Sequence, residues 1–298
     1  MNNPEMTELV RIPTLPASVR VEPGAGGLPK LAIATPHGSA ELYFHGAHLT
    51  AWHPAHSAPV LWMSRESRFE AATPIRGGVP ICFPWFGALP TDPNAPAHGY
   101  ARLMEWSLID AIEPADGGVT LTMELTTPAV RAHYRVTVGP TLTLDLDVHN
   151  VGATPFTFEE ALHSYFAVQD VRQVTITGTE HTDFLDKVAG FSRRTQGDDP
   201  IRFTGETDRV YLNTQATCVI EDPGLRRSIA IHKKYSDTTV IWNPWIDKAK
   251  AMKDFGDDEW PEMVCVETCN VNVHARTVPA GERHTMSAII EVGEISPR

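Results

Sequence analysis

Two ionisable side chains interrupt apolar, strand-like segments in the second half of the chain. His163 lies in Ala161–Phe166 (ALHSYF), and Glu267 lies in Met263–Val271 (MVCVETCNV). A histidine can donate or accept a proton near neutral pH, and burial raises the pKa of a carboxyl group towards values useful for a base. The pair could therefore supply the acid and the base of a proton-transfer reaction. The alternatives are a hydrogen-bonded core histidine and an edge-strand glutamate that points to water.

Two arginines lie in loop-like segments that are rich in glycine and aromatic residues. Arg76 precedes a glycine pair in Ile75–Gly87 (IRGGVPICFPWFG), and Arg102 ends the segment His98–Arg102 (HGYAR). Glycine allows positive φ or a close approach to a ligand, and the planar guanidinium fork matches phosphate oxygens. These segments therefore indicate a phosphate site. The alternatives are an arginine that caps a turn beside core aromatic residues, and a surface turn.

The overall charge limits the partners. The chain of 298 residues has 37 acidic and 25 basic side chains, which gives a formal net charge of -12. An acidic surface repels phosphate backbones, so we expect no nucleic acid partner. A phosphate site would have to be a local cluster of arginine or lysine that outweighs the global field.

Targeting signals and metal motifs are not evident in the sequence. The start, MNNPEMTELVRIPTLP, has neither a cationic beginning nor an apolar stretch, so we expect no signal peptide. No apolar run is long enough for a membrane span, and we expect a cytoplasmic protein. The spacing of Cys265 and Cys269 argues against a metal site. Without a secretory signal, we expect the cysteines to be small, reduced, buried thiols, namely Cys82, Cys218, Cys265 and Cys269.

Strand signals dominate the chain. Apolar and polar residues alternate in Val119–Glu124 and Thr141–His149, as in half-buried strands. Further strands are expected at Leu31–Ala34, Ser39–Phe44, His48–His53, Tyr134–Val138, Phe156–His163, Val174–Thr177, Ala216–Glu221, Ser228–Lys233, Thr238–Trp242, Met263–Cys269 and His284–Val292. One short helix is expected at Ala249–Phe255. This pattern predicts an all-β protein, a large antiparallel β-sandwich with few short helices. No dinucleotide or P-loop motif is present.

Six segments, taken together and in this order, resemble the aldose 1-epimerase superfamily, and within it the glucose-6-phosphate 1-epimerase branch. They are IRGGVPICFPWFG (75–87), HGYAR (98–102), ALHSYF (161–166), TDRVY (207–211), WNPWIDKAKAMKDFGDDEW (242–260) and VCVETCNV (264–271). The resemblance extends from about Ser39 to the C-terminus. It implies a galactose-mutarotase-like supersandwich, which agrees with the strand pattern, and a single domain over residues 1–298 with a lead-in over 1–38.

The resemblance also implies roles for individual residues. His163 matches the general acid of the family and Glu267 matches its general base. Matches to substrate-binding positions fall on Arg76, His98, Arg102 and Asp208. Some relatives have Gln or Asn before the histidine of HGYAR, where this chain has Ala97, so hexose preference is expected to differ. No role is assigned to Lys248, Lys250 or Lys253.

The implied activity is that of an isomerase, a mutarotase that interconverts the α and β anomers of a hexose 6-phosphate by opening and closing the ring. This reaction involves no redox change and no hydrolysis, so we expect no cofactor and no metal. We expect a small phosphosugar as the partner, and the lack of an obvious extra apolar element favours a monomer. Two alternatives stay open: an aldose 1-epimerase for unphosphorylated sugars, and a non-catalytic carbohydrate-binding or sensor protein. Presence of both His163 and Glu267 favours an enzyme.

Overall fold

Strict alternation of apolar and polar residues builds the central strands. In β9 (Leu142–Asn150), Leu142, Leu144, Leu146 and Val148 are all fully buried, as a period of two predicts. The same side chains belong to one large core cluster that also includes residues of the other sheets. The computed structural model describes residues 15–295 of the chain.

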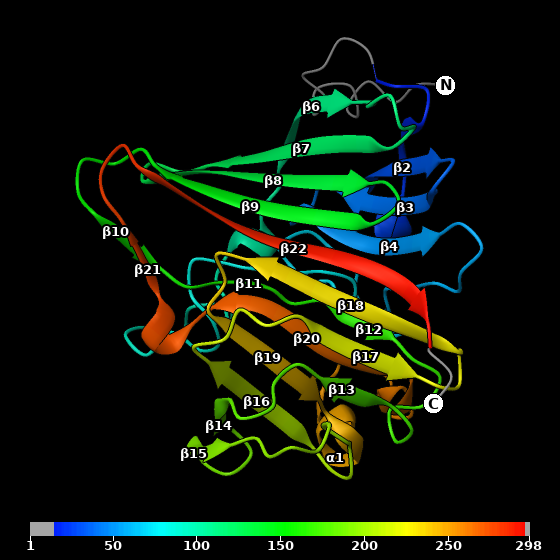
Figure 1. Cartoon of the computed structure of the whole chain (residues 1–298). Helices are drawn as coiled ribbons and strands as arrows, with labels where there is room; N and C mark the ends of the chain where they lie inside the picture. Colours follow the sequence, from blue (N-terminus) through cyan, green and yellow to red (C-terminus); the bar gives the residue numbers. More distant parts are fainter. Residues whose placement is uncertain (1–14, 296–298) are drawn as a thin grey trace.

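Two eight-stranded antiparallel sheets contain most of the strands (Figure 1). The first runs in the order β13-β17-β18-β22-β9-β8-β7-β6. Besides β9, its strands are β6 (Ser107–Ile112), β7 (Val119–Thr126), β8 (Val130–Val138), β13 (Thr175–Thr177), β17 (Cys218–Asp222), β18 (Arg227–Lys234) and β22 (Arg283–Glu294).

The second sheet carries the candidate site and runs in the order β15-β14-β16-β19-β20-β11-β5, with β12 also paired to β20. Its strands are β5 (Ile81–Cys82), β11 (Glu160–Leu162), β12 (Tyr165–Ala167), β14 (Asp183–Asp186), β15 (Ser192–Thr195), β16 (Thr207–Leu212), β19 (Thr238–Asn243) and β20 (Met263–Asn270). In Figure 1, the β17–β18–β22 part of the first sheet lies over β19 and β20, and β22 contacts β20.

Two smaller sheets complete the fold. A four-stranded sheet is formed by β1 (Val19–Pro23), β2 (Pro29–Thr35), β3 (Gly38–Tyr43) and β4 (His48–Pro54), and a two-stranded ribbon by β10 (Phe156–Phe158) and β21 (Arg276–Val278). Helical structure in the described residues is limited to α1 (Trp245–Ala251) and the short 3₁₀ turns Ala25–Gly27, Ala101–Leu103, Trp260–Glu262 and Asn272–His274. The predicted all-β sandwich with few short helices is confirmed.

Two expectations about elements need correction. The helix predicted at Ala249–Phe255 begins at Trp245 and ends at Ala251. The strand predicted at Phe156–His163 is divided between β10 and β11 and ends before His163. The expected lead-in over 1–38 stays a prediction; within it, β1 and β2 pair with each other in the four-stranded sheet. The signal-peptide expectation rests mainly on residues 1–14, which lie outside the described residues.

A buried polar cluster joins the second sheet to β22. Glu160 on β11 is fully buried, and its Oε1 accepts hydrogen bonds from Asn270 Nδ2 (2.7 Å) and His284 Nε2 (2.8 Å). Asn270 lies on β20 and His284 on β22, so one carboxylate connects three strands of two sheets. Breaking such a buried cluster leaves polar groups without partners, which costs more than the net value of the bonds.

Replacing Glu160 with alanine is therefore expected to lower the free energy of unfolding by about 3 kcal/mol. Glu160→Gln keeps an oxygen acceptor at the same place and should cost clearly less. Urea unfolding of both variants and the parent, followed by tryptophan fluorescence, measures the two effects. A Glu160→Ala variant as stable as the parent would show that the cluster does not hold the sheets together.

Candidate active site

His163 lies at a break in the second sheet. β11 ends at Leu162 and β12 begins at Tyr165, and the backbone N–H of His163 donates to the carbonyl of Pro80 (3.1 Å). The ring of His163 stacks on the ring of Tyr165 with centroids 4.7 Å apart and planes 9° apart. The break and the stacking together fix the imidazole on one face of the sheet.

Glu267 reaches the same face from the middle of β20. This strand pairs with β19 on one side and with β11 and β12 on the other, so it is not an edge strand. The side chain of Glu267 is 1% exposed, and its Oε2 has no hydrogen-bond partner among the described residues. The edge-strand alternative is therefore wrong for this residue.

The two side chains meet: His163 Nε2 lies 3.4 Å from Glu267 Oε1. Burial raises the pKa of Glu267 well above its usual value, although Lys187 and Arg102 oppose this effect. Burial also lowers the pKa of His163 well below its usual value, with smaller contributions from His98, Arg76 and Arg102. Both shifts favour neutral forms, so the pair is suited to hold one proton between them.

Arg76 lies beside this pair and already has protein partners. Its Nε and Nη2 donate to Asp254 Oδ2 at 3.2 and 3.0 Å, and its Nη1 donates to the hydroxyl of Tyr165 at 2.8 Å. Burial lowers the pKa of Arg76, but Tyr165 and Asp254 outweigh this effect and the pKa is raised. Arg76 is thus a fixed cation whose charge is largely balanced by Asp254.

The glycine pair after Arg76 has the conformation expected of a tight loop. Gly77 and Gly78 have φ of 113° and 59°, and a Cβ on Gly78 would collide with the carbonyl oxygen of Leu49. The buried ring of His48 contacts the Gly77 carbonyl through Nε2 at 2.7 Å. Burial lowers the pKa of His48 to about 3, so a neutral imidazole donates this bond. The hydrogen bond from His48 therefore fixes the backbone of the glycine loop.

Arg102 differs from Arg76 because no carboxylate in the described chain pairs with it. It lies in the 3₁₀ turn Ala101–Leu103 and is 8% exposed. Its Nη2 donates to the carbonyl of Ala97 (2.8 Å), and its Nε has no hydrogen-bond partner among the described residues. Burial lowers its pKa, as expected of a cation taken out of water. Such a group is a ready anion binder.

His98 presents a donor next to the pair. The residue has φ of 64°, and its Nδ1 accepts a hydrogen bond from the backbone N–H of Gly87 at 3.3 Å. Burial lowers its pKa to about 3, so the ring is neutral and the proton is on Nε2. Its ring packs edge-on against Phe86 at 4.7 Å and His163 at 5.8 Å. His98 is thus placed to donate to a ligand.

Asp208 lies two strands away from Glu267 on the same sheet. Cross-strand registers align Asp208 with Trp242 on β19 and Cys265 on β20, and Glu267 is two residues further along β20. Burial raises the pKa of Asp208, while Lys187, 2.8 Å away, opposes the shift. The Oδ1 of Asp208 has no hydrogen-bond partner within residues 15–295.

The structure thus brings together the six residues that the sequence singled out, namely Arg76, His98, Arg102, His163, Asp208 and Glu267. Sequence reasoning missed three side chains that complete the site: Tyr165, Lys187 and Asp254. Tyr165 lies two residues after His163 in the marker segment ALHSYF, which could have indicated it. Asp254 lies inside the long marker segment at 242–260, which could have indicated it. Lys187 had no sequence signal.

The cysteines, possible metal-binding groups and possible membrane-spanning helices can be examined in the described residues. The four cysteines are all free and buried, as predicted. In the described part of the chain, no group of three or more His, Cys, Asp or Glu side chains is arranged to hold a metal ion. None of its helices is long and apolar enough to cross a membrane.

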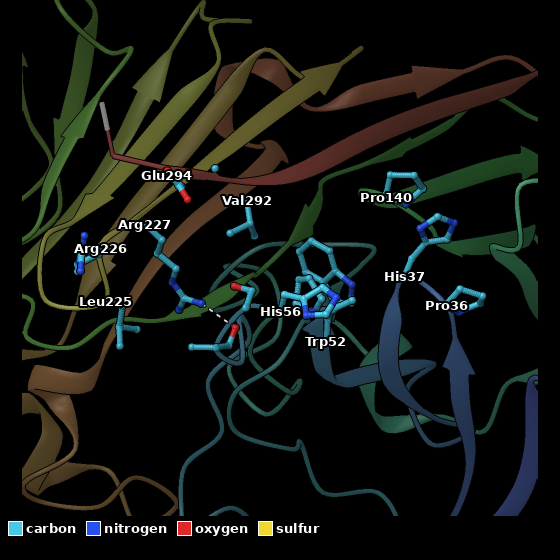
Figure 2. Close-up of a pocket in the computed structure, with 15 residues that line it drawn as sticks. Pro36, His37, Trp52, His56, Pro140, Leu225, Arg226, Arg227, Val292 and Glu294 are labelled. Carbon is cyan, nitrogen blue, oxygen red and sulfur yellow. Dashed lines mark hydrogen bonds between the residues drawn. The ribbon is translucent and has the colours of Figure 1, made fainter. Parts of the chain in front are cut away.

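A separate cavity of about 630 Å³ lies between β4 and the ends of β18 and β22 (Figure 2). Its lining includes His37, Trp52, His56, Arg226 and Arg227, and none of the six predicted residues. The Nη1 of Arg227 donates to the carbonyl of Ala58, the bond drawn dashed in Figure 2, and its Nη2 donates to two further carbonyls. Its lining includes two histidines and Glu294, but among the described residues none of these histidines is paired with a carboxylate as His163 is with Glu267.

Comparisons with known proteins agree with this geometry. The aldose 1-epimerase family model matches residues 29–291. An Escherichia coli (strain K12) protein named "Putative glucose-6-phosphate 1-epimerase" is 36% identical over 270 residues, covering 87% of this chain and 89% of that protein. A Cenchrus ciliaris protein of the same name is 32% identical over 270 residues, with 84% and 81% covered.

A solved structure has a similar fold. The crystal structure of a "putative mutarotase" from Salmonella typhimurium superposes with a TM-score of 0.88 at 31% sequence identity, covering 98% of this chain and 99% of that one. The family model spans most of the chain, and the fold, the six motif segments and the relatives agree. The chain belongs to the aldose 1-epimerase family.

Proposed function

We propose that this protein interconverts the α and β anomers of a hexose 6-phosphate, with glucose 6-phosphate as the first candidate substrate. The observation that carries the proposal is the buried pair of His163 Nε2 and Glu267 Oε1, which lie 3.4 Å apart. The guanidinium of Arg102 lies beside this pair and has no carboxylate partner among the described residues. The relatives named as glucose-6-phosphate 1-epimerases support the same reaction.

Anomer exchange requires the pyranose ring to open and close. The Glu267 carboxylate removes the proton of the C1 hydroxyl, the C1–O5 bond breaks, and protonated His163 gives its Nε2 proton to O5. The open aldehyde rotates about C1–C2 and closes on the other face, with both proton transfers reversed. No electron leaves the substrate and no water is added, so a positioned acid and a positioned base are sufficient.

Binding of the phosphosugar would favour the productive protonation state. Without substrate, burial favours a protonated Glu267 and a neutral His163. A phosphate group next to His163 favours the imidazolium, because opposite charges stabilise each other in a buried site. The positive charges of Lys187 and Arg102 already favour the Glu267 carboxylate. One proton therefore shifts from Glu267 to His163 when substrate binds.

The remaining roles follow from the partners of each residue. We assign Arg102, with Arg76, to the 6-phosphate, and His98 and Asp208 to ring hydroxyls. Asp254 and Tyr165 hold Arg76 in place and do not touch the substrate. The prediction of a cofactor-free reaction, and of a cytoplasmic monomer, stays a prediction.

Magnetisation-transfer NMR of glucose 6-phosphate, with glucose in a parallel sample and a chelator in both, tests the proposal. We expect fast exchange between the anomers of glucose 6-phosphate and much slower exchange for glucose. A Lys250→Met variant on the exposed side of α1 is a matched control that should equal the parent. Faster exchange of glucose would contradict the phosphate site, and no acceleration of either sugar would contradict an enzyme and favour a sugar-binding protein.

A further inference from the structure

Lys187 is held in the candidate site by the pairing of two strands. It follows β14 directly, and its backbone N–H donates to the carbonyl of Asp208 on β16 at 2.9 Å. The side chains are also joined, because Lys187 Nζ lies 2.8 Å from Asp208 Oδ2. The ammonium also lies over the ring of Phe86, 5.6 Å from its centroid. Lys187 therefore has a defined position at the wall of the site.

The Lys187–Asp208 pair has unused hydrogen-bonding capacity. Asp208 Oδ1 is buried and has no partner within residues 15–295, and an ammonium group has three donors. A buried acceptor without a donor is costly, so the geometry favours a ligand that brings hydroxyl groups. Two neighbouring hydroxyls of a sugar match an acceptor and a donor that lie side by side.

The position of the pair around the site indicates which hydroxyls it meets. Arg76 donates to the hydroxyl of Tyr165, whose ring stacks on His163, whereas Asp208 is aligned through β19 with β20, the strand of Glu267. The charge of Arg76 acts on the pKa of His163, those of Lys187 and Asp208 act on the pKa of Glu267, and that of Arg102 acts on both. In the proposed reaction, O5 faces His163 and the C1 hydroxyl faces Glu267. C6 is attached to the ring next to O5, whereas C2 lies on the other side of C1. The phosphate end therefore falls on the side of His163 and Arg76, and C2 and C3 fall on the side of Glu267 and Lys187.

We propose that Lys187 and Asp208 bind the vicinal hydroxyls of C2 and C3, and that Lys187 is a residue that determines hexose specificity at these carbons. The ammonium donates to one hydroxyl oxygen, and Asp208 accepts from the neighbouring hydroxyl. This inference rests on the proposed function and names the part of the sugar that the site discriminates. An ammonium that instead bound the phosphate would select for the phosphate and not for the ring hydroxyls.

Replacement of Lys187 by methionine keeps an unbranched side chain that is one atom shorter and removes its charge. We would measure kcat/KM for glucose 6-phosphate, 2-deoxyglucose 6-phosphate, 3-deoxyglucose 6-phosphate and glucose, with Lys250→Met as the control. The parent is expected to prefer glucose 6-phosphate over at least one deoxy sugar by about 10-fold or more, the value of a hydrogen bond to a charged group. Lys187→Met should lose most of that preference and keep its preference for phosphosugars.

Three results would overturn the inference. One is an unchanged preference against both deoxy sugars in Lys187→Met. The second is an equal loss on all four sugars, which would indicate a structural role for Lys187. The third is a loss confined to the phosphosugars, which would place the ammonium on the phosphate. If the parent exchanged none of the sugars, the proposed function itself would fail, which is a different result from all three.

Discussion

Replacing Glu267 with glutamine is expected to reduce kcat for anomer exchange by about 10²- to 10⁴-fold, the usual value of a positioned proton transfer. Glutamine has nearly the same shape as glutamate, so the walls of the site stay in place. It cannot accept the proton of the C1 hydroxyl, so ring opening loses its base. KM should change little, because the proposed phosphate contacts of Arg76 and Arg102 are retained.

The same substitution is expected to stabilise the folded protein at alkaline pH. Because burial raises the pKa of Glu267 well above its usual 4.5, the folded chain keeps this proton at a pH where the unfolded chain has lost it. Its contribution to stability is therefore complete below about pH 4.5 and declines as pH rises towards the folded pKa. Glutamine has no ionisable proton, so the variant loses no stability through this residue as pH rises. The gain in Tm should be near zero at pH 4 and about 2 °C or more at pH 8.

Two measurements on one protein sample check these expectations. NMR exchange gives kcat and KM, and differential scanning fluorimetry gives Tm between pH 4 and pH 8. Glu267→Asp retains a carboxylate on a shorter side chain and should keep part of the activity that Glu267→Gln loses. An active Glu267→Gln variant would remove the base role, and a lower Tm at pH 8 would mean that the buried carboxylate stabilises the fold.

Periodicity predicted much of the fold because burial on one face repeats every second residue. The four apolar positions of β9 were all predicted correctly, and so was the placement of Glu267 on a strand. The same logic failed at β14, β15 and β16, which were not predicted as strands. Their sequences lack a clear apolar alternation, and they are defined by pairing: β15 pairs with β14, β14 with β16, and β16 with β19.

The error in the short helix has a local cause at its start and, at its end, a cause in contacts distant along the chain. Pro244 and Asn243, whose Oδ1 accepts from the Trp245 N–H, fix the start of α1 earlier than predicted. The end is earlier because the following residues are used elsewhere: Asp254 pairs with Arg76, and Phe255 packs on Trp62 with ring centroids 4.9 Å apart. A local pattern does not contain these contacts, which join segments more than 170 residues apart.

The candidate site was predictable in its residue types but not in its pairings. His163 and Glu267 were chosen because a histidine and a glutamate stood in apolar segments, and only the sheet register puts them 3.4 Å apart. Lys187 was missed because its link to Asp208 depends on the pairing of β14 with β16. Arg76 and Arg102 looked equivalent in sequence, whereas the structure pairs only Arg76 with a carboxylate.

This difference predicts that Arg102 is the main source of phosphate selectivity. Replacement of Arg102 by methionine is expected to lower kcat/KM for glucose 6-phosphate by about 100-fold, the value of one or two charge-assisted hydrogen bonds, and for glucose by less than about 3-fold. Arg76→Met should show a smaller difference between the two sugars, because Asp254 already balances its charge.

Inhibition by inorganic phosphate gives a second readout of the same site without turnover of a phosphosugar. The parent should lose activity towards glucose as phosphate is added, and Arg102→Met should be about 10-fold or more less sensitive. Arg102→Lys retains the charge without the planar fork and should fall between the two. Since Arg102 is buried, the Tm of each variant must be measured with its activity. Equal losses on glucose and glucose 6-phosphate, in a variant with the parent's Tm, would mean that Arg102 supports the loop through Ala97 and that the phosphate lies elsewhere.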